Sequence, residues 1–245
     1  MSFEQDVRAR FRRGDSAGVL QMAQAEVERA RAAGEPSGEV EGLYALARVA
    51  ARGGDLSRAR QLAGSALEVA MRSGDRRLEE RPRHVLAAVA RMSGDYHRAR
   101  ELYLAGIELN EELGQPELVN AEYHNLAFTE LHLGNLDRAR QLFAEGQERV
   151  FREGYRSFVP YLGVAAAALA SAEGDHLRTA RMVGFTDSAY AAIGQVPDPD
   201  DAQELANARG TAVEVLGEPV FASAYAAGAA SAATEIFGHT WAQPA

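Results

Sequence analysis

This 245-residue chain contains histidine, arginine and carboxylate side chains that could do chemistry, and it contains no cysteine. The lack of cysteine excludes disulfides, a thiol nucleophile and thiolate zinc sites. The sequence also has no phosphate-binding glycine-rich loop, metalloprotease helix motif or nucleophile elbow. We therefore predict no catalytic residue, no cofactor and a protein that is not an enzyme.

Histidine and arginine recur at a spacing of forty residues. His84 and His124 form one such pair, and arginine recurs at Arg58, Arg98, Arg138 and Arg178. Two histidines on neighbouring repeats would lie roughly 10 Å apart, which is the helix-packing distance. A metal would need a third ligand at closer range, and we find no Asp or Glu in register. We expect two histidines that face a groove without a metal.

Glycine sets the underlying period. It recurs every twenty residues, at Gly14, Gly34, Gly54, Gly74, Gly94, Gly114, Gly134, Gly154, Gly174 and Gly194. Glycine can adopt the left-handed conformation that ends a helix, so this spacing predicts repeated antiparallel helix pairs. Every second glycine precedes Asp or Asn, which can cap the next helix: Asp15, Asp55, Asp95, Asn135 and Asp175.

The predicted unit is two helices in about forty residues. Small side chains recur where the two helices would cross, at Ala47, Ala87, Ala127 and Ala167 and again at Ala59, Ala99 and Ala139. This pattern resembles the tetratricopeptide repeat, most clearly over residues 37–193. The departures are a period of forty instead of thirty-four and the absence of tryptophan at the first-helix anchor. Longer units of this kind resemble the repeats of bacterial signal-transduction ATPases and transcriptional regulators.

The resemblance implies an all-α, right-handed superhelical solenoid of antiparallel helix pairs, with residues 1–245 as a single domain. We expect units at about 2–34, 35–74, 75–114, 115–154 and 155–194, with a degenerate sixth pair and a C-terminal cap over 198–245. In the sixth pair, Ala222 is expected at the helix crossing. The apolar tail from Ile236 to Trp241 is expected to cover the end of the array, and a dimer contact there is the alternative.

In tetratricopeptide arrays the first helices line a concave face. By that resemblance, the exposed positions predict a groove that is cationic and aromatic in its middle. Such a groove suits an acidic or carboxylate-bearing peptide, and solvation of a concave surface is the alternative. Of the chaperone-tail clamp of such domains, only Asn125 falls on a matching place. The predicted partner-binding residues are Tyr44, Arg48, His84, Arg91, His124, Asn125, Phe128 and Tyr161.

Charge and hydropathy narrow the classes of partner. The net charge of −9 argues against nucleic acid and against an anionic membrane surface. The N-terminal residues do not resemble a secretion signal, so we expect a cytoplasmic protein. The predicted function is a protein- or peptide-binding adaptor or regulatory scaffold. A small-molecule or signal-peptide sensor with ligand-dependent curvature is the alternative, and self-association through the solenoid ends is a third.

Overall fold

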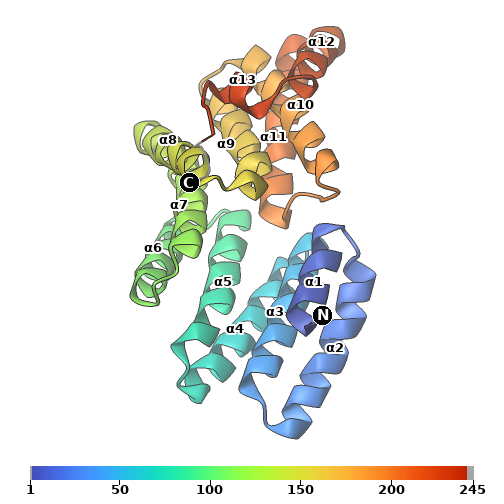
Figure 1. The fold of residues 1–245 in the computed structure, drawn as a ribbon, viewed down its shortest axis with the longest axis vertical. Helices are drawn as coiled ribbons and strands as arrows, with labels where there is room; N and C mark the ends of the chain where they lie inside the picture. Colours follow the sequence, from blue (N-terminus) through green and yellow to red (C-terminus); the bar gives the residue numbers. More distant parts are fainter. Residues whose placement is uncertain (1, 242–245) are drawn as a thin grey trace. The chain divides into compact units, whose positions relative to one another are not determined.

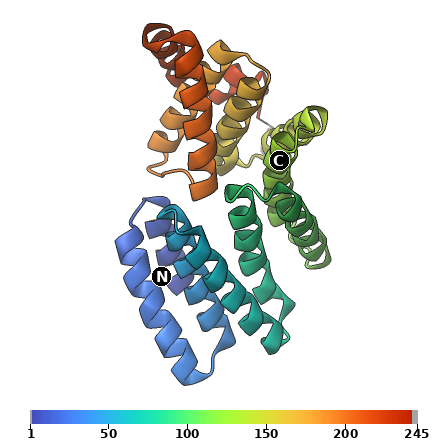
Figure 2. The same ribbon diagram turned by 180° about the vertical axis from the view of Figure 1, so that it is seen from behind.

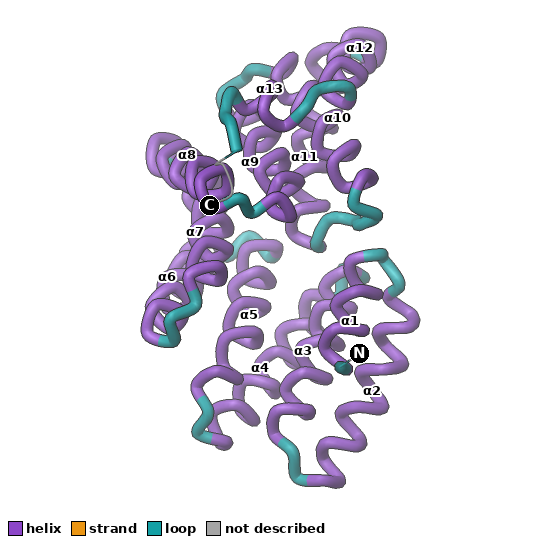
Figure 3. Tube along the Cα trace, viewed as in Figure 1, coloured by secondary structure: helices purple, strands orange, loops and turns teal. Residues whose placement is uncertain are grey.

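In a computed structural model, residues 2–241 are described, and within them the chain is helical without a β-strand (Figures 1 and 3). The all-α helical-repeat class is therefore confirmed. The chain forms two compact units, residues 1–126 and 127–245, while a single domain over 1–245 stays a prediction. The helices in the first unit are α1 Phe3–Arg12, α2 Ser16–Ala33, α3 Pro36–Arg52, α4 Leu56–Ser73, α5 Glu80–Met92 and α6 Tyr96–Glu112. Helix α7, Pro116–His132, spans the boundary, and the second unit adds α8 Leu136–Glu153, α9 Val159–Ala172, α10 His176–Ala192, α11 Pro199–Leu216, α12 Glu218–Ala229 and α13 Ala233–Phe237.

The ten glycines of the twenty-residue period all have positive φ, between 62° and 81°. The side chains of Asp15, Asp55, Asp95 and Asp175 each accept a hydrogen bond from the backbone N–H three residues on, which caps the following helix as predicted. Asn135 differs from these four aspartates. Its side chain makes no cap bond, and its Nδ2 donates to Glu130 Oε2 at 2.7 Å.

The connections between helix pairs start the next helix in two ways. Pro36, Pro116 and Pro199 are the first residues of α3, α7 and α11, where the missing N–H has no intrahelical partner to lose. The other two pairs begin with a 3₁₀ turn, η1 (Arg76–Glu79) before α5 and η2 (Arg156–Phe158) before α9. Proline stands inside the first turn of each of those helices as well.

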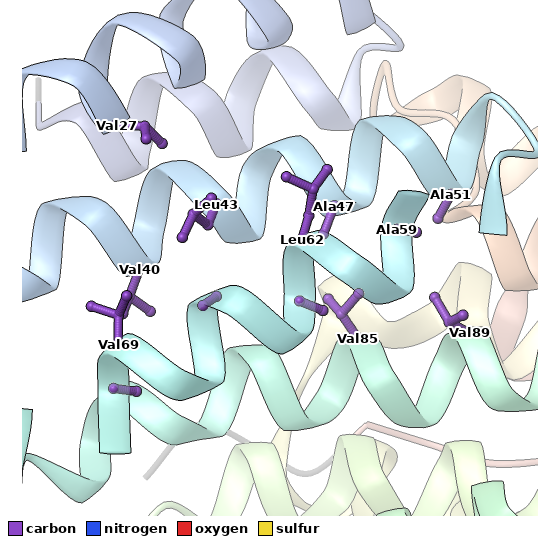
Figure 4. Packing of buried hydrophobic residues seen from close by; sticks show 13 residues of the cluster. Val27, Val40, Leu43, Ala47, Ala51, Ala59, Leu62, Val69, Val85 and Val89 are labelled. Atoms are coloured by element: carbon purple, nitrogen blue, oxygen red, sulfur yellow. The ribbon is translucent and has the colours of Figure 1, made fainter. Parts of the chain in front are cut away.

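In the first unit, α2, α3, α4 and α5 pack in sequence as antiparallel neighbours (Figures 1 and 2). The crossing residues Ala47 and Ala59 are fully buried, and apolar side chains from four helices surround them (Figure 4). Alanine at the crossing lets the helices approach closely enough for the larger side chains to fill the remaining space. Helix α1 covers one side of α2 and α3 with Val7 and Phe11.

In the second unit, α10 packs against α9, α11 and α12. Helices α10 and α12 meet backbone to backbone: a Cβ added at Gly228 would lie 1.8 Å from the carbonyl oxygen of Arg181. The prediction that Ala222 stands at the helix crossing of the sixth pair, α11 with α12, is wrong, because Ala222 is exposed. Phe221 and Gly228 are the buried residues of α12.

None of the helices within the described residues has the length and apolar character needed to cross a membrane.

Candidate functional site

The predicted partner-binding residues of the first unit lie on three helices. Tyr44 and Arg48 are on α3, His84 and Arg91 on α5, and His124 and Asn125 on α7. These are the first helices of their pairs, so the structure brings the six onto corresponding elements. The surface formed by these helices together with Glu4 of α1 is called the first-helix face below.

Arg91 and Asn125 form a buried contact. Arg91 is 3% exposed, and its Nη2 donates to Asn125 Oδ1 at 3.4 Å. Asn125 Nδ2 donates to the carbonyl oxygen of Ala121 at 3.1 Å. The expectation that these two side chains are exposed is wrong. His124 is buried as well, at 8% exposure.

Tyr44 and Arg48 stay partly exposed and form a cation–aromatic group with α1. The guanidinium carbon of Arg48 lies 3.8 Å from the ring centre of Phe11 and 5.6 Å from that of Tyr44. Arg81 approaches the same tyrosine ring at 5.5 Å. Such contacts hold an arginine head in place and hide part of its charge from solvent.

Two predicted residues belong to the second unit. Phe128 is fully buried, with its ring edge-on to Phe143 at a centroid distance of 4.9 Å. The expectation of exposure is wrong here because the ring fills the space next to the second helix of the pair. Tyr161 is partly exposed, and its hydroxyl donates to Asp198 Oδ2 at 3.3 Å.

Sequence reasoning missed the carboxylate that meets His84. Glu122 Oε1 lies 2.9 Å from His84 Nδ1, and Glu122 is only 2% exposed. The second oxygen, Oε2, is buried and has no hydrogen-bond partner. Gly106 of α6 makes room for this group, since a Cβ at that position would stand 3.3 Å from the carboxyl carbon.

The repeat register held a signal for Glu122. From the second repeat unit to the fifth, the residue twelve positions before the inner glycine is buried, and apart from Glu122 it is Gly42, Pro82 or Leu162. A carboxylate at a position otherwise taken by small or apolar residues is an exception that the sequence shows. The sequence does not show that Glu122 lies close to His84, because the two residues are thirty-eight positions apart.

Three more carboxylates surround this pair. Glu41 of α3 and Glu4 of α1 both accept hydrogen bonds from Arg81. Glu80, at the start of α5, makes no hydrogen bond or ion pair with any described residue. Burial raises the pKa of the Glu80 carboxyl; nearby His84 opposes the increase and nearby Glu122 adds to it. Burial also raises the pKa of Glu41, against the effect of Arg81.

This arrangement corrects the predicted charge of the face. Four carboxylates, Glu4, Glu41, Glu80 and Glu122, gather around Arg81 and His84, so this end of the face is acidic. The search for an Asp or Glu in register with the histidines missed Glu122, which contacts His84. Within residues 2–241, no group of three His, Asp or Glu side chains could hold a metal ion.

Comparison with solved structures supports a tetratricopeptide-like helical-repeat fold. The Rap protein complexed with competence and sporulation factor matches with a TM-score of 0.68 and 14% identity over 91% of this chain. This chain spans 61% of that protein's length. BtubC from P. vanneervenii matches with a TM-score of 0.54 and 24% identity, over 86% of this chain and 87% of that one. No protein-family description and no curated protein matches the sequence.

Proposed function

We propose that this chain is a non-enzymatic binding module, an adaptor or regulatory scaffold, that holds a peptide segment of a cytoplasmic partner on its first-helix face. A helical-repeat fold supports this, because stacked first helices offer an extended binding surface. The structural neighbour Rap, solved with competence and sporulation factor, supports a regulatory role by analogy of fold. Contact roles for Tyr44, Arg48 and His84 are part of the proposal.

The observation that carries the proposal is the half-satisfied carboxylate of Glu122. A buried polar atom without a hydrogen-bond partner costs about 1–3 kcal/mol, and here one oxygen has His84 while the other has no partner. A buried polar side chain without a full set of hydrogen bonds calls for an explanation, because an apolar residue would pack there at lower cost. We take binding of a partner as that explanation. The other units place glycine, proline or leucine at this point of the register.

The chemistry of the face selects a cationic group on the partner. Arg81 is already paired with Glu41 and Glu4, and Arg91 is buried, so neither is available to a carboxylate ligand. Glu80 has no cation beside it in an ion pair. We therefore propose a segment that presents an arginine or lysine side chain to the partly exposed Glu80, next to the buried Glu122, in place of the acidic partner predicted from the sequence.

An array of heptapeptides of varied sequence, each with arginine, citrulline or glutamate at the centre, tests this function. Binding of the best arginine peptide is then measured by fluorescence anisotropy against wild type, Glu80→Gln and Glu108→Gln. Glu108 is exposed on α6, so its variant has the same charge change away from the face. A charge-assisted hydrogen bond contributes about 1.5–3 kcal/mol, so citrulline and Glu80→Gln should each weaken binding about tenfold or more.

Three results would contradict the proposal. If no peptide binds at all, the first-helix face is not a peptide site. If the selected peptides bind wild type and Glu80→Gln equally, the face does not select a cation. A loss that is equal for Glu108→Gln would assign the effect to overall charge instead of to the site.

A further inference from the structure

The segment after α12, residues 231–241, packs on helices α8, α9 and α10 of the second unit. Its rings gather around Phe151 of α8: Trp241 at a centroid distance of 4.5 Å, His239 stacked at 5.0 Å and Phe237 at 6.0 Å. Phe237 also meets Phe185 of α10 edge-on at 5.4 Å. The rings of the tail contact α8 and α10, and coverage of the end of the array stays a prediction.

The receiving surface includes a cation next to the rings. The guanidinium carbon of Arg156 lies 4.4 Å from the ring centre of Trp241. Below the rings, Val150, Phe151 and Leu162 form a buried apolar cluster, with Tyr155 and Phe158 at its edge. We call this surface, formed by Phe151, Phe185, Leu162 and Arg156, the aromatic slot.

The repeat register shows that the slot is specific to this unit. The positions equivalent to Phe151, seventeen residues after the inner glycine, are exposed in the other units: Arg31, Met71, Glu111 and Ala191. The positions equivalent to Phe185, eleven residues after the inner glycine, are Ala25, Ser65, Ala105 and Glu145. Two large rings therefore replace small, charged or solvent-facing residues only where the tail binds. Both rings also pack on α9, Phe151 beside Leu162 and Phe185 beside Gly163, and the rings of the tail add a contact that the other units lack.

The contacts that hold the tail come mainly from rings. Within residues 231–241, Gln147 Nε2 donates a hydrogen bond to the carbonyl oxygen of Phe237 at 3.4 Å. Phe237 and Trp241 remain partly exposed in their places. A non-helical link, Ser231–Ala232, connects the segment to α12. An occupant held by ring packing on a short link can leave without unfolding the helices beneath it.

We propose that the aromatic slot is a second binding site of this chain, for a partner segment with two aromatic side chains four residues apart, and that residues 236–241 are its built-in occupant. Phe237 and Trp241 supply that spacing in the structure. The ligand class is an aromatic peptide with low net charge, since the slot offers ring faces, ring edges and a guanidinium. The partner segment competes with the tail, so the tail acts as an internal inhibitor of the slot. This inference does not depend on the proposed function of the first-helix face.

A labelled peptide with the sequence of residues 233–241 tests the slot. Its binding is measured by fluorescence anisotropy against wild type, the tail variant Phe237→Ala with Trp241→Ala, and the tail variant that also has Phe151→Leu. The tail variant should bind the peptide about tenfold more tightly than wild type, or better, because a tethered occupant competes at an effective concentration of order 1 mM. Adding Phe151→Leu, which keeps an apolar side chain but removes the ring, should abolish that gain.

Tryptophan fluorescence gives a second readout without a tail variant. Trp241 is the single tryptophan of the chain. A competitor peptide with phenylalanine in place of tryptophan should shift the emission of wild type to longer wavelength and expose the indole to iodide quenching. A peptide with alanine at both aromatic positions should do neither.

Three results would overturn the proposal: equal peptide affinity of wild type and tail variant, an unchanged affinity after Phe151→Leu, or an unchanged Trp241 signal with saturating competitor. Light scattering tests whether the tail of a second copy of this chain occupies the slot. A wild-type dimer that Trp241→Ala dissociates would place the tail of a second copy in the slot, and would also overturn it. Circular dichroism of each variant confirms that the helix content is retained.

Discussion

The first-helix face of the first unit and the aromatic slot of the second are opposite departures from one repeat. In the first unit a carboxylate, Glu122, stands at a buried position where the register otherwise holds small or apolar residues. In the second, Phe151 stands where the register otherwise exposes its residue to solvent. The shared positions, glycine turns and crossing alanines, build helix pairs. The positions that break the register are the ones for which we propose a ligand, at Glu122, and a covering segment, at Phe151.

We expect the largest change in the free energy of unfolding from Phe151→Ala, at a position that departs from the repeat. The ring is 2% exposed beneath the tail, so its removal should lower the free energy of unfolding by about 3–5 kcal/mol. The register-equivalent Met71 is 59% exposed, and Met71→Ala should change stability by less than about 0.5 kcal/mol. Urea unfolding of both variants measures the difference. Similar losses of stability for Phe151→Ala and Met71→Ala would show that Phe151 does not differ from the equivalent position in the second repeat unit.

The next effect concerns the helix crossing that supports the slot. Gly228→Ala places a Cβ against the carbonyl oxygen of Arg181, and should destabilise the protein by about 1–3 kcal/mol or more. Gly210 of α11 has open space around its Cβ position, so Gly210→Ala should be neutral or stabilise by up to about 1 kcal/mol. Thermal unfolding followed by circular dichroism tests the pair. Tolerance of Gly228→Ala would mean that α10 and α12 do not meet this closely.

A smaller effect distinguishes the turns. Asp55 accepts from the N–H of Arg58, so Asp55→Ala should cost about 1 kcal/mol through loss of the cap. Asn135 makes no cap bond, and Asn135→Ala should cost less, because it loses only a side-chain hydrogen bond to Glu130. Chemical denaturation of both variants measures the difference, and a larger loss at Asn135 would be the contrary result.

The smallest effect, and the only pH-dependent one, is at Glu80. Its pKa is raised in the folded state above the ordinary value of 4.5, so ionisation destabilises the fold. Glu80→Gln should therefore raise the melting temperature at pH 7, and the gain should vanish as the pH falls through the raised pKa towards the ordinary value. The exposed control Glu108→Gln should show no such trend. A variant that is less stable than wild type at pH 7 would mean that the ionised carboxylate is satisfied within the fold.

The sequence predicted the scaffold well because each turn is a local event. A glycine with positive φ and an aspartate that caps three residues on need no distant contact, and both recur with the period. The candidate sites depend on contacts between residues far apart in the chain. Glu122 reaches His84 across thirty-eight residues, and Trp241 reaches Phe151 across ninety. Burial of Phe128 and Arg91 depends on neighbouring helices, so a face assigned by resemblance alone placed them in solvent.

Hydrogen exchange with the selected arginine peptide shows directly whether the peptide binds at the first-helix face. We expect slower exchange of backbone amides around Arg81–Val85 of α5 and Ala121–Asn125 of α7 when the peptide is bound. We expect no change around Phe151 in α8. We also expect that this protection is lost in Glu80→Gln and kept in Glu108→Gln. Protection confined to α8 and α9, or protection at α5 that survives Glu80→Gln, would contradict the assignment of the carboxylate face as the peptide site.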